Sequence, residues 1–545
     1  MARLSGWPAR GLAVLAGVAA GLAHPPFGML PGLLGYALLL GLLNTEGPRP
    51  WRSAFFRGWL GGLGYFAVAV WWITEPFMVD AANQGWMAPF ALVLMASGLA
   101  LFWGLAGLIF RVLNPGALGQ ALVFAGAFAG FEWLRGHVLT GFPWNLPGES
   151  WRAGSAPSQA TALAGAYGLS WITLAIAAAP AVLGARAPGR TKAGVTAAAV
   201  AGLAALYGFG LARLGGAAPP SPDAPLIRVV QANIDQKDKW KPENLRSIFE
   251  TYAVLTNRPA AARPAIVVWP EGALPAVIDD LLAPGSEYAE RLRDVIVPGQ
   301  TLLMGANHVA MGPDGQLRYF NSLVALTRDP EALRVTGIYD KHRLVPFGEF
   351  MPLGELAGRV GFRSLVHMPD DFTAGPLPRP MRLRGAGAVQ PLICYEALFP
   401  GFTRDAVRRS GIRPGWILNI SNDAWFGVTI GPLQHLNIAS YRAIEEGLPI
   451  VRATPTGVSA VIDGYGRTRP GARLGLGVLG VIDARLPGAP PPTLFSKIGD
   501  GLFAVMLLLS GCTALGCRVR RPRLDDAGVS GSVRARAWIR VAGYG

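Results

Sequence analysis

Pro391-Leu392-Ile393-Cys394-Tyr395-Glu396 joins an apolar run to a polar turn and places a cysteine at the junction. A short buried run of this kind predicts a β-strand, and a residue at its end can face a cleft instead of the core. Cys394 is the one cysteine of three that lies outside a hydrophobic, membrane-like segment. The stretch therefore predicts a strand that presents a reactive thiol.

Two further apolar runs end in complementary chemistry. Ala265–Trp269 leads into Pro270-Glu271, and Val335–Asp340 leads into Lys341. A carboxylate can take the proton of a thiol, and an ammonium group can stabilise both the thiolate and the oxyanion of a tetrahedral intermediate. The three strand ends predict an acyl-transfer site. In it Glu271 is the general base and later acid, Lys341 stabilises charge, and Cys394 is the nucleophile.

The motifs around these residues resemble a known family. They are Trp269-Pro270-Glu271, Tyr339-Asp340-Lys341-His342, Pro346-Phe347-Gly348-Glu349 and Cys394-Tyr395-Glu396. They resemble the nitrilase superfamily, which uses a Glu-Lys-Cys triad. Together with Ser421–Gly427, Pro432–His435 and a hydrophobic N-terminal half, they resemble in particular the apolipoprotein N-acyltransferase family. The resemblance runs from about His24 to the last hydrophobic segment.

The composition indicates a membrane protein. The 545 residues are 51% hydrophobic and only 15% charged, with a mean hydropathy of +0.34, which is too apolar for an ordinary soluble enzyme of this size. The hydrophobic segments are Gly11–Ala23, Leu30–Leu43, Gly58–Ile73, Ala88–Ile109, Ala117–Trp133, Ala160–Leu183, Ala193–Leu211 and Ile498–Leu515. We expect about seven spans before the large polar block and one after it. A cleaved signal peptide is the alternative for the first segment.

The positive charge is concentrated in the hydrophobic regions. The net charge is +15, but Ser221 to Lys497 holds 30 Lys and Arg against 26 Asp and Glu, so this block carries only +4 and the remainder +11. With the alternating loops assigned to opposite sides, 16 of the other 19 basic residues fall on one side. The positive-inside rule makes that side cytoplasmic. The excess charge thus reports topology, and no nucleic-acid partner is expected.

The chain is predicted to divide into four parts. They are a transmembrane domain at 1–214, an exported catalytic domain at 221–497, a C-terminal transmembrane helix at 498–517 and a basic cytoplasmic tail at 518–545. The block in the middle alternates β-rich runs with helical stretches, which predicts an α/β layered domain. The resemblance implies that it is a nitrilase-like αββα sandwich. The fold class is therefore a polytopic α-helical membrane domain plus this sandwich.

Further site residues are implied by the resemblance. Glu349 matches a second active-site glutamate, which could orient Lys341 or form a plain ion pair with it. Tyr395 and Glu396 follow the nucleophile, and their backbone N–H groups could help to bind an oxyanion. Four aromatic residues are candidates for substrate binding: Trp240 near the acyl chain, Trp144 as a portal residue or an interfacial anchor, and Trp425 and Phe426 at the pocket mouth. The histidines lack metal-ligand spacing, and no metal is expected.

The resemblance implies a function. A phospholipid, resembling phosphatidylethanolamine, would donate an acyl group to Cys394 as a thioester. The acceptor would be the α-amino group of the lipid-modified cysteine of a diacylated apolipoprotein, at the periplasmic face of the bacterial inner membrane. No cofactor is implied, because a thioester is reactive enough without one. Two alternatives stay open: a membrane-tethered nitrilase-type amidase, in which water accepts the acyl group, and a non-catalytic lipoprotein-binding scaffold.

Overall fold

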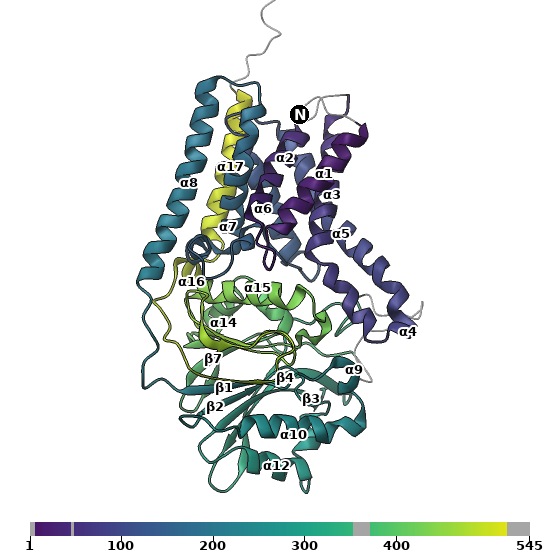
Figure 1. Cartoon of the computed structure of the whole chain (residues 1–545), viewed down its shortest axis with the longest axis vertical. Coiled ribbons are helices and arrows are strands. Elements are labelled where there is room, and N and C mark those ends of the chain that lie inside the picture. Colours follow the sequence, from purple (N-terminus) through teal and green to yellow (C-terminus); the bar gives the residue numbers. More distant parts are fainter. Residues whose placement is uncertain (1–5, 45–47, 353–370, 520–545) are drawn as a thin grey trace, which may run out of the picture.

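A computed structural model describes residues 6–44, 48–352 and 371–519. Figure 1 shows a bundle of helices at one end of the molecule and an α/β domain at the other. The first described residues, the connection between α7 and α8, and the C-terminal end of α17 lie at the end of the bundle that is far from the α/β domain. Most of the predicted basic tail, beyond Val519, lies outside the described residues.

Helices occupy the predicted hydrophobic segments. They are α1 (Gly6–Leu22), α2 (Leu34–Leu43), α3 (Pro50–Ala69), α5 (Ala88–Leu113), α6 (Gln120–His137), α7 (Thr161–Ala178), α8 (Gly189–Gly215) and α17 (Gly501–Val519). Among the described residues, three stretches are long and apolar enough to cross a membrane: Ala81–Leu113, Pro157–Gly184 and Gly189–Gly215. Leu30–Leu43 and Gly501–Gly516 are shorter apolar helices. The expected number of spans therefore remains a prediction.

The first helix is an integral part of the bundle. A Cβ atom on Gly17 of α1 would lie 1.8 Å from the carbonyl oxygen of Gly61 in α3, so only glycine permits this approach of two backbones. Small residues at helix crossings allow the close van der Waals packing on which association in a bilayer depends. Such packing favours retention of α1 over its removal as a signal peptide.

The α/β domain contains two six-stranded sheets. The first has the order β12-β1-β2-β3-β4-β5 and the second β11-β10-β9-β8-β7-β6. In each, the three strands that include the sheet centre are parallel, β1-β2-β3 and β7-β8-β9, and the outer pairs are antiparallel. The strands are β1 (Leu226–Gln231), β2 (Ile266–Trp269), β3 (Thr301–Met311), β4 (Leu317–Arg328), β5 (Leu333–Asp340), β6 (Met381–Leu383), β7 (Gly387–Ile393), β8 (Trp416–Ile420), β9 (Ile450–Ala453), β10 (Ala460–Ile462), β11 (Thr468–Arg473) and β12 (Gly480–Arg485).

Apolar side chains hold the layers together. Val268 and Leu303 of the first sheet pack against Leu418 and Val451 of the second in one buried cluster. Helices α10 (Leu245–Thr256) and α12 (Glu287–Val295) cover the outer face of the first sheet. Helices α14 (Phe402–Ser410) and α15 (Gly431–Glu446) lie between the second sheet and the bundle. The predicted fold class, an αββα sandwich joined to a helical membrane domain, is confirmed.

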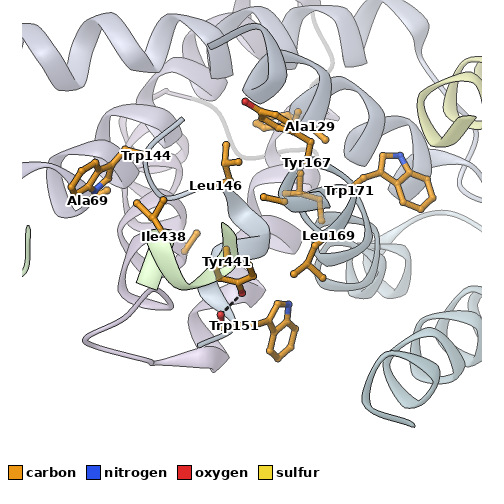
Figure 2. Packing of buried hydrophobic residues seen from close by; sticks show 14 of the residues in the cluster. Ala69, Ala129, Trp144, Leu146, Trp151, Tyr167, Leu169, Trp171, Ile438 and Tyr441 are labelled. Atoms are coloured by element: carbon orange, nitrogen blue, oxygen red, sulfur yellow. Dashed lines mark hydrogen bonds between the residues drawn. The ribbon is translucent and has the colours of Figure 1, made fainter. Parts of the chain in front are cut away.

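The joint between the two parts is tightly packed. One cluster of buried side chains includes bundle residues such as Leu146 and Leu169 together with Ile438 and Tyr441 of α15, and Figure 2 draws these residues from close by. Polar side chains of α15 bond across the same boundary: Trp144 Nε1 donates to Gln434 at 2.8 Å, and Asn437 Nδ2 donates to the carbonyl of Glu149 at 3.0 Å. The α/β domain therefore packs directly against the bundle and is not held to it by the connecting segments alone.

Candidate active site

The three predicted strand ends converge between the sheets. Glu271 follows β2 by two residues, Lys341 directly follows β5, and Cys394 directly follows β7 of the other sheet. Cys394 has φ +47°, in the left-handed region that residues other than glycine rarely occupy. Such backbone geometry turns the chain sharply from the strand into the 3-10 turn Cys394–Leu398. Backbone strain of this kind clusters at active sites, where surrounding contacts maintain it.

Lys341 lies between two carboxylates. Its Nζ is 2.8 Å from Glu349 Oε1 and 3.4 Å from Glu271 Oε1, and the side chain is 1% exposed. Burial alone favours the neutral amine, but the charges of Glu349 and Glu271 outweigh it and raise the pKa of Lys341 above its ordinary value. These contacts favour the cationic form of the lysine and hold its ammonium between the two carboxylates.

Asn321 on β4 joins both carboxylates, and the sequence analysis missed it. Its Nδ2 donates to Glu271 Oε1 at 2.6 Å and to Glu349 Oε1 at 2.7 Å. Its backbone carbonyl accepts from the backbone N–H of Lys341 at 2.8 Å. The second oxygen of Glu271 accepts from the backbone N–H of Asn422 at 2.6 Å. A lone polar residue inside a strand gives little signal in a sequence, and only the register of β4 beside β5 reveals the contact.

The thiol of Cys394 is protonated at rest. Burial raises its pKa well above the ordinary value, and the negative charge of Glu271 adds to the effect. Lys341 and the hydrogen bond between Cys394 and Ser421 oppose it, since both favour the thiolate. A buried thiol that holds its proton needs a nearby base before it can react. Glu271 is the carboxylate whose charge acts most strongly on this thiol.

Glu396 holds two segments of the site in register. Its Oε1 accepts from the backbone N–H of His342 at 2.8 Å, beside Lys341, and its Oε2 accepts from the N–H of Ile393 at 2.8 Å, beside Cys394. Tyr339 OH donates to the same carboxylate at 3.0 Å. Neighbouring Tyr395 reaches the other way, and its hydroxyl donates to the carbonyl of Gly141 in the bundle. Both side chains thus position the nucleophile.

A buried network lies behind the thiol. Asp423 accepts from Ser421 Oγ at 2.7 Å and from Arg452 at 2.7 Å, and it lies 3.0 Å from His435 Nδ1. These partners hold the pKa of the Asp423 carboxyl well below its usual range, although burial opposes them. Burial also lowers the pKa of His435, so this histidine is a neutral hydrogen-bonding residue. The network fixes Ser421 against the sulfur.

The candidate aromatic residues differ in their burial and packing. Trp144 is 2% exposed and packs against Trp72, with ring centroids 4.5 Å apart, and against Phe426 at 5.7 Å. Because it is buried, Trp144 does not lie at a lipid surface as an interfacial anchor would. Trp425 and Trp240 are half-buried, and Trp240 follows the short helix α9 (Gln236–Lys239). The structure therefore packs Trp144 and Phe426 against each other.

The α/β domain has the fold of a carbon–nitrogen hydrolase. A family model described as "Carbon-nitrogen hydrolase" matches residues 226–487, and one described as "Apolipoprotein N-acyltransferase N-terminal domain" matches residues 16–179. An amidase of the nitrilase superfamily from Nesterenkonia AN1 aligns over 52% of this chain and 98% of its own, with a TM-score of 0.33 and 16% identity.

Curated relatives match nearly the whole chain. A Caulobacter vibrioides protein named apolipoprotein N-acyltransferase is 55% identical over 94% of this chain and 95% of its own length. A Bradyrhizobium diazoefficiens protein of the same name is 37% identical over 95% and 96%. The chain therefore belongs to the apolipoprotein N-acyltransferase family, and it is a membrane enzyme whose fold supports acyl transfer by nitrilase-type chemistry.

Proposed function

We propose that this enzyme moves an acyl chain from a phospholipid to the α-amino group of the lipid-modified N-terminal cysteine of bacterial apolipoproteins. The observation that carries the proposal is the buried assembly of Glu271, Lys341, Glu349 and Asn321 beside the thiol of Cys394. The acceptor follows from the name that the relatives share. The donor follows from the chemistry, because a thioester can form from a lipid ester without a nucleotide.

In the first half-reaction Glu271 takes the proton of Cys394, and the sulfur attacks the carbonyl carbon of a phospholipid ester. The carbonyl oxygen becomes an oxyanion, which the ammonium of Lys341 stabilises. When the tetrahedral intermediate collapses, the bond to the glycerol oxygen breaks, and Glu271 returns its proton to that oxygen. Lysophospholipid leaves, and the acyl group stays on Cys394 as a thioester.

In the second half-reaction the neutral α-amine of the apolipoprotein attacks the thioester carbonyl. Glu271 takes a proton from the nitrogen, and Lys341 again stabilises the oxyanion. Collapse of this intermediate expels the sulfur, which recovers a proton from Glu271, and an amide forms. The resting thiol is regenerated, so the reaction needs no co-reactant besides the phospholipid and the apolipoprotein.

The position of the site suits two lipid substrates. Tyr395, next to the nucleophile, bonds to Gly141 in the loop that follows α6, and Phe426 packs on Trp72 and Trp144 of the bundle. The reacting groups of both substrates lie at the headgroup level of a bilayer. We therefore place the enzyme in the inner membrane with residues 221–497 in the periplasm, preceded by the helices of 1–214 and followed by that of 498–517.

Intact-protein mass spectrometry tests the covalent step. Purified enzyme incubated with phosphatidylethanolamine alone should gain one acyl group, and a diacylated lipopeptide should then discharge it. Cys394→Ala should gain none. Glu271→Gln should not accumulate the adduct, because the thiol proton then has no acceptor.

The outcomes separate the alternatives. Rapid loss of the adduct in water, without lipopeptide, would identify a hydrolase of the amidase type. Acylation of the lipopeptide by Cys394→Ala would exclude the thioester. Binding of lipopeptide with no acyl transfer by the wild type would identify a scaffold.

A further inference from the structure

A second buried lysine lies beside the general base. Lys239, the last residue of α9, is 3% exposed. Its Nζ lies 3.0 Å from the position that a Cβ atom would take on Gly272, the residue after Glu271. Among the described residues, neither an ion pair nor a hydrogen bond is found for this ammonium. Its ring contact is with the adjacent Trp240, at 5.7 Å.

Gln236 adds an unused donor on the same side of α9. It lies three residues before Lys239, so the two side chains share one face of the helical turn. It is 5% exposed, and its Oε1 accepts from Asn422 Nδ2 at 3.1 Å. That bond turns Nε2 away from Asn422, and Nε2 has no partner among the described residues. The side chains between them, Lys237 and Asp238, are exposed instead.

The two donors are tied to the catalytic group. Asn422, which bonds to Gln236, also donates its backbone N–H to Glu271 Oε2 at 2.6 Å. Burial lowers the pKa of Lys239 to about 8, and Glu271 is the charge that opposes the change. A buried cation without a paired anion is unfavourable, and a ligand that supplies the anion and hydrogen-bond acceptors would relieve the cost.

We infer that Lys239 and Gln236 bind the phosphodiester of the acyl-donor phospholipid, while its ester carbonyl lies at Cys394. The inference rests on the proposed function, since it concerns the donor of that reaction. A phosphodiester carries a permanent negative charge and lies only the glycerol backbone away from the scissile ester. Lysine and amide donors are common ligands of phosphate oxygens.

The acyl acceptor, the apolipoprotein, does not match the hydrogen-bond donors Lys239 and Gln236. An apolipoprotein brings an α-amine to the site, and when protonated that amine would be repelled by Lys239. The diacylglyceryl group that it carries has no phosphate. Lys239 therefore distinguishes the two lipids by charge, and it favours the phospholipid in the half-reaction that loads Cys394.

Two acyl-donor lipids, one with a phosphate-containing headgroup and one without it, test this assignment. The rate of acyl-adduct formation on Cys394 is measured with a phosphatidylethanolamine and with a diacylglycerol of the same acyl chains. We expect the wild type to prefer the phospholipid, and Lys239→Met to reduce that preference about 10- to 100-fold, as loss of a charged hydrogen bond does. Lys239→Arg should keep most of it. Lys241→Met is the matched control, because Lys241 is two residues away, 54% exposed and paired with Asp238.

The reaction of Lys239→Met with diacylglycerol shows whether the variant is folded. An equal loss with both donors, or no preference in the wild type, would overturn the assignment. Binding provides a separate measurement: a short-chain phosphatidylethanolamine should bind Cys394→Ala more tightly than Cys394→Ala/Lys239→Met. If the wild type forms no adduct with either donor, the proposed function fails, and this binding comparison alone then decides whether the phosphate site exists.

Discussion

The surroundings of Lys341 fix the position of its ammonium group and not only the sign of the charge. Its Nζ fits between Glu349 at 2.8 Å and Glu271 at 3.4 Å with almost no exposed surface. A guanidinium group is planar and longer, and it cannot place a single donor at the same point. We therefore expect Lys341→Arg to be nearly as damaging as Lys341→Ala.

The measurement is the rate of adduct formation on Cys394 with phospholipid. Removal of one oxyanion donor typically costs about 10²- to 10³-fold, and both variants should fall by that order. Near-normal activity of the arginine variant would mean that a diffuse positive field is sufficient.

Asn321 should affect the rate of the reaction by positioning the two carboxylates, although it takes no direct part in the chemistry. Its one amide nitrogen bonds to both Glu271 and Glu349. Asn321→Leu keeps the volume but leaves two carboxylate oxygens without that donor, and we expect adduct formation to slow about 10- to 100-fold. Thermal unfolding measured in parallel should change little. A large loss of stability with an unchanged rate would make Asn321 structural.

At this scale the sequence predicts the residues with distinctive chemistry. Glu271, Lys341 and Cys394 each follow an apolar run, so their positions at strand ends could be read directly, and the structure brings them together. Asn321, Ser421 and Lys239 could not be identified in this way. Their importance depends on which strands or turns become neighbours, and a single polar residue does not encode that.

Among the elements, α15 shows why periodicity can mislead. Fourteen of its residues are buried, including Gln434, Asn437 and Glu445, so no face of the helix is left to water. An amphipathic stripe predicts a surface helix, but α15 has polar groups on several sides, and Gln434, Asn437 and Glu445 among them bond to the bundle. Its helical form and its central place were not predicted. The strands β2, β5 and β7 were predicted, since their apolar runs are short and bounded by turn residues.

The last residue of α15 should make stability depend on pH. Glu446 is 3% exposed, and burial and the adjacent Glu445 raise its pKa from 4.5 to about 7. The negative end of the helix dipole acts in the same direction. Because the folded protein holds this proton more tightly than the unfolded chain, the contribution is complete below pH 4.5 and is lost as the pH rises through about 7.

Apparent Tm in detergent, measured from pH 5 to pH 8, checks this expectation. The wild type should lose up to about 1.4 kcal/mol of stability per pH unit from this one proton within that window. Glu446→Gln should reduce the slope without abolishing it, because burial also raises the pKa of Glu149, Glu396 and Glu445 to about 7. Glu290→Gln on α12, which removes an exposed carboxyl, should leave it unchanged. An identical slope in Glu446→Gln and the wild type would contradict the assignment.

For the whole molecule, the orientation in the membrane is the main prediction. The connection between α7 and α8 lies at the end of the bundle opposite the α/β domain, and the charge distribution makes that end cytoplasmic. In a background of Cys394→Ala, Cys512→Ser and Cys517→Ser, a membrane-impermeant maleimide should label Glu331→Cys from the periplasm. It should label Ala187→Cys only after the membrane is permeabilised. The reverse pattern would exclude a periplasmic catalytic domain.

The continuous packing between α15 and the bundle has a consequence for engineering. A catalytic domain cut out at its two connections would expose the side of α15 that now bonds to Trp144 and Glu149, and it should aggregate instead of dissolving. Chimeras should obey the same constraint. Exchanging the membrane helices between two relatives should succeed only when α15 travels with them, so the natural module boundary runs through the sandwich and not along the linker.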